Sequence, residues 1–268
     1  MTPQTKIPIK ENNLSFGEHC EELRRAVLRC LVVWGIVAIS LFCFRDLLFS
    51  IVFAPAKSNF CTYQFLHHLA DRCGLGDVAT QTSDILFINF NLTRPLVAHI
   101  QVAMAGALLL TTPFIVAQCF RFIAPAIHKG KRLYSAFVLC IAILLFYIGG
   151  AVAYFVVFPF AFRFLALYQI EEVVFNQIAL DSYLSMILTL TLLMGLCFEI
   201  PMALYILSKI GIVDRTWLIR YRKHAVVVIC IIAALITPTT DVFTMLLVII
   251  PFYLLYEASI LKIRKSPL

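Results

Sequence analysis

A single carboxylate stands inside a long apolar stretch of this sequence. Glu199 lies in the run LCFEIP, with apolar residues on both sides and Pro201 two residues later. A carboxylate in hydrocarbon is costly, so such residues usually face a bundle interior or a cavity and belong to a functional path. Pro201 lacks a backbone N–H and leaves a carbonyl to be satisfied. We expect Glu199 to make a polar contact inside a membrane; the alternative is a protonated, hydrogen-bonded Glu199 with a structural role only.

A second charged cluster precedes the first apolar run, in SFGEHCEELRRAV. On a helix, Glu18, Glu21, Glu22 and Arg25 lie near one face, because they are spaced by three and four residues. Acids beside a cytoplasmic membrane surface oppose its negative potential. They are therefore expected to meet a basic partner; the alternative is a solvated helix start with internal ion pairs.

The other chemistry-bearing residue types predict neither catalysis nor a metal. Most of the nine cysteines are scattered singly through apolar runs, where we expect them to pack as small apolar side chains. The histidines lack the spacing of metal ligands. No phosphate loop, nucleophile elbow or dinucleotide fingerprint is present. We expect no enzyme activity, no metal and no cofactor. Cys61 and Cys73 share one loop and would pair if that compartment is oxidising.

The composition predicts a membrane protein. Hydrophobic residues make up 62% of the chain and charged residues 14%, with a mean hydropathy of +0.93. Soluble domains are about 45–50% apolar and about 25% charged. The polar first 25 residues do not resemble a cleavable export signal. We therefore expect residues 1–268 to form one polytopic membrane domain.

Six apolar runs are candidates for spans. They are residues 26–44, 96–118, 135–158, 183–208, 225–237 and 242–261. The fifth, with 13 residues, would reach only about 20 Å as a helix, less than the roughly 30 Å of a bilayer core. The sixth carries Pro251 near its middle and Glu257 towards its end. These last two runs are either two short spans that thin the bilayer or a re-entrant hairpin.

The placement of basic residues predicts the orientation. With both chain ends inside, 17 of the 22 Lys and Arg residues fall in inner segments, as the positive-inside rule requires. This distribution explains the net charge of +7 without a nucleic-acid partner. The outer segments are residues 45–95 and 159–182, and Phe60–Cys73 in the first is expected to be an amphipathic helix. Gly149 and Gly150 predict close helix packing in the third span.

Five segments, in order, resemble the TatC family of the twin-arginine protein translocase. They are EHCEELRR at 18–25, FIAPA at Phe122–Ala126 followed by a basic loop, LLFYIGGAVAYFVVFP at Leu144–Pro159, FEIP at Phe198–Pro201 and TPTTDVF at Thr237–Phe243. The resemblance implies a cupped helical bundle in the bacterial cytoplasmic membrane. It also implies a receptor that binds twin-arginine signal peptides at the cytoplasmic face. TatA- and TatB-like single-span proteins, further copies of the chain and the proton-motive force would complete the export machinery.

The resemblance assigns roles to particular positions. Glu22 and Arg24 fall on the amino-terminal recognition element, and Phe122 on the cytoplasmic-loop element. Glu199 falls on an intramembrane Glu associated with partner helices. Pro55 and Asp241 fall on outer-loop positions that are important to the complex.

One position departs from the family pattern. Lys131 stands where many members have an acidic residue that helps to bind the paired arginines. We therefore expect Glu22, with Glu18 or Glu21, to supply the negative charge. The alternatives are a proton- or ion-coupled transporter, for which no internal repeat is visible, and an intramembrane enzyme, for which no catalytic constellation is visible.

Overall fold

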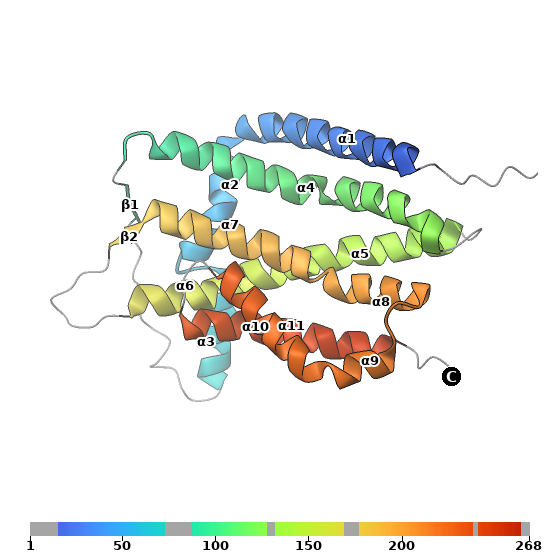
Figure 1. The fold of residues 1–268 in the computed structure, drawn as a ribbon. Helices are drawn as coiled ribbons and strands as arrows, with labels where there is room; N and C mark the ends of the chain where they lie inside the picture. Colours follow the sequence, from blue (N-terminus) through green and yellow to red (C-terminus); the bar gives the residue numbers. More distant parts are fainter. Residues whose placement is uncertain are drawn as a thin grey trace, which may run out of the picture.

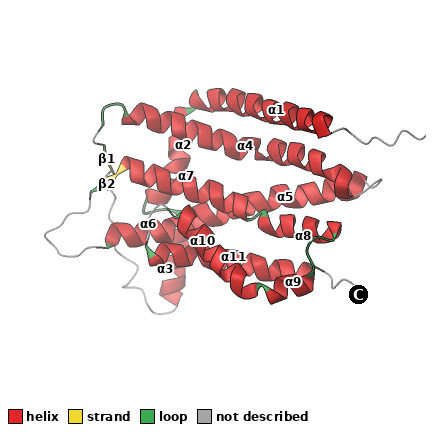
Figure 2. Cartoon of the chain, viewed as in Figure 1, coloured by secondary structure: helices red, strands yellow, loops and turns green. Residues whose placement is uncertain are grey.

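The computed structural model describes residues 16–72, 87–89, 91–127, 132–168, 177–237 and 241–263. Long antiparallel helices form most of this part of the chain, and two short strands lie at one end (Figures 1 and 2). The long helical segments are α1 (Phe16–Phe42), α4 (Arg94–Ile127), α5 (Arg132–Val152), α7 (Leu180–Cys197), α8 (Ile200–Ile210), α10 (Arg222–Ile236) and α11 (Val242–Lys262).

Within the described residues, five helical stretches are long and apolar enough to cross a membrane. They are Cys20–Phe42, Arg94–Arg121, Ala136–Leu167, Leu180–Ile210 and Val242–Lys262. The 15 residues of α10 extend about 22 Å, so α10 is a short sixth candidate. The predicted all-helical membrane fold with about six spans is confirmed. α1 begins and α11 ends at the same end of the bundle (Figure 1), which is the predicted cytoplasmic end.

The third span continues as helix beyond its expected end at residue 158, and the fourth span is broken between α7 and α8. After α5, a π-helical turn, η3 (Ala153–Val157), leads into α6 (Phe158–Leu167), so helix continues into the segment expected to be an outer loop. Pro159 does not end this helix because it lies in the first turn of α6, where a proline is tolerated. Pro201 lies in the first turn of α8 and accompanies the break after α7.

The first outer segment folds into short helices across the outer end of the bundle. They are α2 (Arg45–Val52), the 3₁₀ turn η1 (Ala54–Ala56) and α3 (Cys61–Arg72). α3 confirms the amphipathic helix expected at Phe60–Cys73. Farther along, β1 (Phe87–Ile88) pairs in parallel with β2 (Ile178–Ala179). Arg94 and Asp181 form an ion pair between the elements that follow these strands.

An aromatic cluster joins the outer segment to the bundle. The ring of Tyr183 is 1% exposed and stacks on Phe53, with ring centroids 5.5 Å apart. Phe158 and Phe162 meet the same ring edge-on. The Tyr183 hydroxyl donates a hydrogen bond to the carbonyl oxygen of Val52, at 2.7 Å. The buried tyrosine therefore has both its ring and its hydroxyl satisfied.

Candidate functional site

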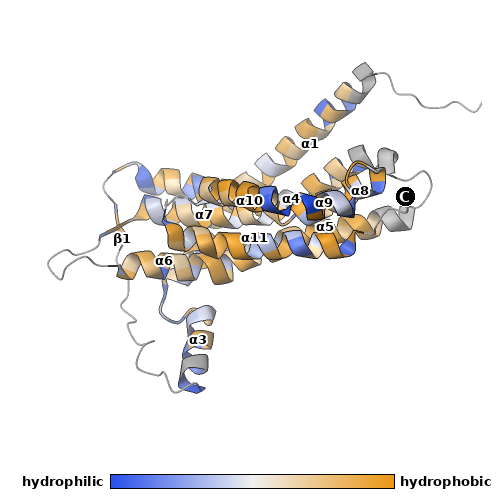
Figure 3. Ribbon diagram, turned by 60° about the horizontal axis from the view of Figure 1, so that its bottom comes forward, coloured by the Kyte–Doolittle hydropathy of each residue, from blue (hydrophilic) through white to orange (hydrophobic). Residues whose placement is uncertain are grey.

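The first turns of α1 project from the bundle at the predicted cytoplasmic end. Figure 3 shows α1 diverging there from the other long helices. The charged side chains in these turns, Glu21, Glu22, Arg24 and Arg25, are all exposed. Nearer the middle of α1, the indole N–H of Trp34 donates to the carbonyl of Met104 in α4, at 3.0 Å. The second half of α1 thus packs on α4 and positions the exposed, charged first turns.

The charges on α1 are not equivalent. The Arg25 guanidinium lies 2.7 Å from a carboxylate oxygen of Glu21, one turn earlier. Among the side chains that the structure describes, none forms an ion pair with Glu22. Glu18 lies one turn before Glu22 on the same helix, but its side chain is outside the described part. Glu21 thus forms an ion pair within α1, whereas the Glu22 carboxylate is available to bind a ligand.

The remaining residues expected at the cytoplasmic site are only partly described. Phe122 lies near the cytoplasmic end of α4, at the same end of the bundle as the start of α1 (Figure 1). Its side chain lies outside the described part, and so does the whole of Lys131. The shared end is consistent with a site formed by α1 and α4, and the residue roles there remain predictions.

Glu199 occupies the break between α7 and α8. Its Oε1 atom is buried and has no hydrogen-bond partner among the described residues. Pro201 removes the N–H that would otherwise reach the carbonyl of Cys197. Buried polar atoms are nearly always hydrogen-bonded, so an exception needs an explanation. Within the described part of the chain, the junction therefore offers one unpaired carboxylate oxygen, Oε1 of Glu199, inside the membrane-spanning region.

The two outer positions named by the resemblance have structural contacts. Pro55 is buried in η1, and its carbonyl oxygen lies 3.1 Å from the hydroxyl of Tyr63, which donates to it. Burial raises the pKa of Tyr63 above its usual range, which keeps this donor protonated. Asp241 caps α11 by accepting a hydrogen bond from the backbone N–H of Thr244, at 2.6 Å. Both residues therefore help to shape the outer end.

Neither the predicted disulfide nor the expected absence of a metal is tested by the described residues. Cys61 is exposed at the start of α3, but Cys73 lies outside the described residues, so their pairing stays a prediction. Within the described part, no group of three or more His, Cys, Asp or Glu side chains could hold a metal ion.

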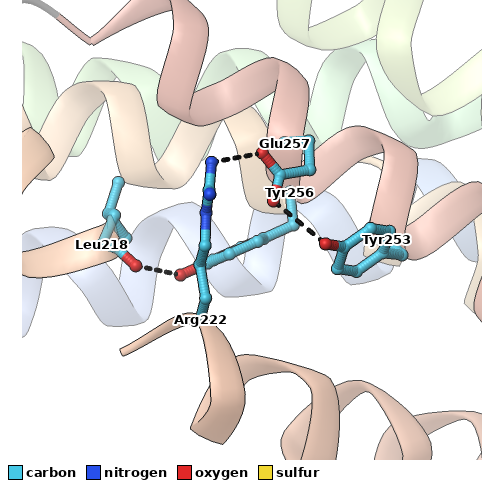
Figure 4. A network of polar contacts seen from close by, with 5 residues as sticks. All are labelled: Leu218, Arg222, Tyr253, Tyr256 and Glu257. Carbon is cyan, nitrogen blue, oxygen red and sulfur yellow. Dashed lines mark hydrogen bonds and ion pairs between the residues drawn. The ribbon is translucent and has the colours of Figure 1, made fainter. Parts of the chain in front are cut away.

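A polar network near the cytoplasmic ends of α10 and α11 was not anticipated (Figure 4). Arg222 and Glu257 form an ion pair at 2.8 Å, and the Tyr253 hydroxyl donates to the other carboxylate oxygen of Glu257. The Tyr256 hydroxyl donates to the carbonyl of Leu218 in α9 (Arg215–Arg220), at 2.8 Å. The charge of Glu257 within an apolar run was the signal that could have revealed a basic partner.

Comparisons with known proteins identify the family. The family model described as Sec-independent protein translocase protein (TatC) matches residues 18–251. The TatC protein of Escherichia coli strain K12 is 33% identical over 244 residues, which cover 90% of this chain and 85% of that protein. TatCy of Bacillus subtilis strain 168 is 32% identical and covers 94% and 90%, respectively. The TatC protein of Blattabacterium sp. subsp. Periplaneta americana is 31% identical, with coverage of 94% and 95%.

The fold leads to the same family. A crystal structure described as the twin arginine translocase receptor TatC in DDM superposes with a TM-score of 0.76 and 30% sequence identity. The match covers 92% of this chain and 100% of the crystallised chain. Sequence and structure agree over nearly the whole length, and the chain belongs to the TatC family, the receptor subunits of the twin-arginine, Sec-independent protein translocase.

Proposed function

We propose that this chain binds twin-arginine signal peptides at its cytoplasmic face and exports folded proteins together with TatA- and TatB-like single-span partners, using the proton-motive force. Members of this family are protein-transport subunits of the bacterial cytoplasmic membrane and not enzymes. The observation that carries the proposal is the exposed Glu22 carboxylate on the projecting first turns of α1.

Electrostatics favour α1 as the arginine-binding element. Two guanidinium groups remain charged at any physiological pH and form their best contacts with carboxylates. Arg25 already engages Glu21, so Glu22 is the described acid that is available to a ligand. Glu18 is one helical turn away and would add a second carboxylate on the same face. Lys131 would repel the ligand, so the acids of α1 have to compensate for it.

A binding measurement with a fluorescent twin-arginine peptide tests this proposal. Glu22→Gln and Glu18→Gln should each weaken binding by roughly tenfold, because each loses a charge-assisted hydrogen bond. Asp46→Asn, which removes an exposed acid of α2 at the outer end, is the matched control and should not change affinity. A twin-lysine peptide should bind weakly to every variant. Unchanged affinity in both glutamate variants would contradict the assignment of the site.

The second part of the proposal assigns the α7–α8 junction to a partner helix. The buried, unpartnered Oε1 of Glu199 is costly in a bilayer, where no water is available to satisfy it. A transmembrane partner with a polar donor would therefore be selected over lipid. Its contact would lie in the membrane, away from the peptide site at the start of α1.

Glu199→Ala should therefore leave signal-peptide affinity nearly unchanged but reduce co-purification of the single-span partners and the export of folded cargo. Glu257→Gln is the matched control, because Glu257 already has partners within the chain and should retain partner binding. Normal export and normal partner recovery in Glu199→Ala, at equal expression, would refute this role.

A further inference from the structure

Three prolines in the part of the chain that the structure describes share an unusual feature. Proline lacks an N–H, so in a helix the carbonyl four residues earlier loses its donor. At each of these three positions, the carbonyl four residues earlier accepts a hydrogen bond from a hydroxyl group of a distant segment, but only Pro113 lies in the same α-helix as that carbonyl. The hydroxyl, carbonyl and proline are Tyr147, Leu109 and Pro113 (3.1 Å); Tyr154, Ile51 and Pro55 (2.6 Å); and Thr62, Phe155 and Pro159 (2.5 Å).

In the first of these sets, the carbonyl and the proline lie within one uninterrupted helix. α4 is helical from Arg94 to Ile127, so residue 113 would donate to Leu109 if it had an N–H. Tyr147, on α5, is 41% exposed, and both it and Leu109 lie within candidate membrane spans. Water cannot satisfy a carbonyl within hydrocarbon, and an unpaired one is costly there. The Tyr147 hydroxyl therefore replaces the donor that Pro113 removes.

We propose that Tyr147 is a positioning residue that fastens α5 to α4 at the point where the hydrogen-bond ladder of α4 is interrupted. Beyond Pro113, the cytoplasmic half of α4 packs on α5 and α8 through Phe120, Val138 and Met202. The hydroxyl bond holds this half in place against α5. That half ends in the segment that carries Phe122, so its positioning matters for peptide binding if the proposed function holds.

The other two hydroxyl bonds lie beside prolines outside an α-helical interior, because Pro55 is in the 3₁₀ turn η1 and Pro159 follows the π-helical turn η3. Tyr154 and Phe155 lie in the π-helical turn η3, and their partners Ile51 and Thr62 lie in the outer segment. Here the two hydrogen bonds join the outer helices to the third span. The three proline-linked hydroxyls thus act between segments that are far apart in sequence, where a phenylalanine or valine of similar shape would fill the space without donating.

A double-mutant cycle tests the assignment directly on the full chain in detergent. Tyr147→Phe removes the donor alone and should lower the unfolding midpoint by about 2–4 °C. Pro113→Ala restores an N–H to the helix. In that background Tyr147→Phe should have little effect, because Leu109 then has a backbone donor. Such a non-additive result isolates the pairwise contribution.

The control uses a hydroxyl that donates to a different carbonyl. Tyr154→Phe should lower the midpoint equally with and without Pro113→Ala, since Tyr154 serves Ile51 and not Leu109. If Tyr147→Phe behaves in the same additive way, the proposed link between Tyr147 and Pro113 is wrong.

Peptide affinity, measured well below the unfolding midpoints, tests the positioning role. Tyr147→Phe should weaken twin-arginine peptide binding by about threefold or more, and this loss should disappear when Pro113→Ala is also present. A non-additive stability cycle with unchanged affinity would overturn the positioning role. If the unsubstituted chain fails to bind the peptide, the proposed function fails, and the stability cycle still decides whether Tyr147 serves Leu109.

Discussion

Gly149 and Gly150 are adjacent in α5, yet a methyl group would meet different surroundings at each position. A Cβ atom on Gly149 would lie 2.6 Å from Cγ of Phe198 and 2.8 Å from the backbone oxygen of Met194. A Cβ atom on Gly150 would have its nearest neighbours at 3.8 Å, an ordinary contact, in Thr191. The absence of a side chain at Gly149 therefore lets α5 approach α7 closely.

This contrast gives a matched pair of variants. Gly149→Ala should lower the free energy of unfolding by about 1–3 kcal/mol, because a backbone atom cannot move aside easily. Gly150→Ala should be neutral or stabilise the protein by up to about 1 kcal/mol, since alanine favours helix. Thermal unfolding of both variants in the same detergent measures the difference. Equal midpoints for the two variants would show that α5 and α7 do not approach as described.

At the residue level, the sequence indicated which polar side chains need a binding partner in the apolar spans, but it seldom indicated which residue that partner is. Glu199 stood out because a carboxylate is costly among apolar residues. The link between Tyr147 and Leu109 could not be predicted, because it joins residues 38 positions apart and depends on how α4 and α5 pack. The pairing of Glu257 with Arg222 was missed for the same reason.

At the scale of the helices, a polar network links α10 and α11 at their cytoplasmic ends (Figure 4). The Arg222–Glu257 pair is partly exposed, with 45% and 27% of the two side chains accessible. Pairs of this exposure contribute about 0–1 kcal/mol and are screened by salt. The pair therefore orients the two helices more than it stabilises them.

A double-mutant cycle with Arg222→Ala and Glu257→Ala should give a coupling of about 0.5–1 kcal/mol. This coupling should decrease when the ionic strength is raised to 1 M, where the Debye length is about 3 Å. Lys223→Ala, at the neighbouring exposed residue, is the control and should not couple to Glu257→Ala. A coupling of zero at low salt would mean that the ion pair does not hold these helices.

The bounds of a helix were predictable where the spacing of apolar residues alone determines them. The amphipathic pattern of Phe60–Cys73 predicted α3 almost to the residue. The end of the third span was harder to place, because Pro159 resembles a helix terminator in sequence but lies in the first turn of α6. The strands β1 and β2 have two residues each, too few to show an alternating pattern.

For the molecule as a whole, the unusual feature is the short helix α10, which packs beside the longer α11. A helix of 15 residues spans the bilayer only if the bilayer thins around it or if the pair enters and returns to the same side. We expect α10 to cross as a short span and α11, with 21 residues, as a full one, which places the start of α11 at the outer surface.

Single cysteines in a cysteine-free background test this topology. Val242→Cys, at an exposed position in the first turn of α11, should react with an impermeant maleimide added from outside. Leu261→Cys, exposed in the last turn, should react only after the membrane is opened. Labelling of Val242→Cys from the inner side alone would establish a re-entrant hairpin.

The pairing of β1 with β2 has a consequence for how the protein is made. Its two strands belong to different outer segments, so they can meet only after both segments have crossed the membrane. A ribosome adds about 5–20 residues per second, and Phe87 therefore waits several seconds or more for Ile178 to be synthesised. The Arg94–Asp181 ion pair has the same requirement. Closure of the outer end is accordingly a late step in biogenesis, completed only after the third span has been inserted.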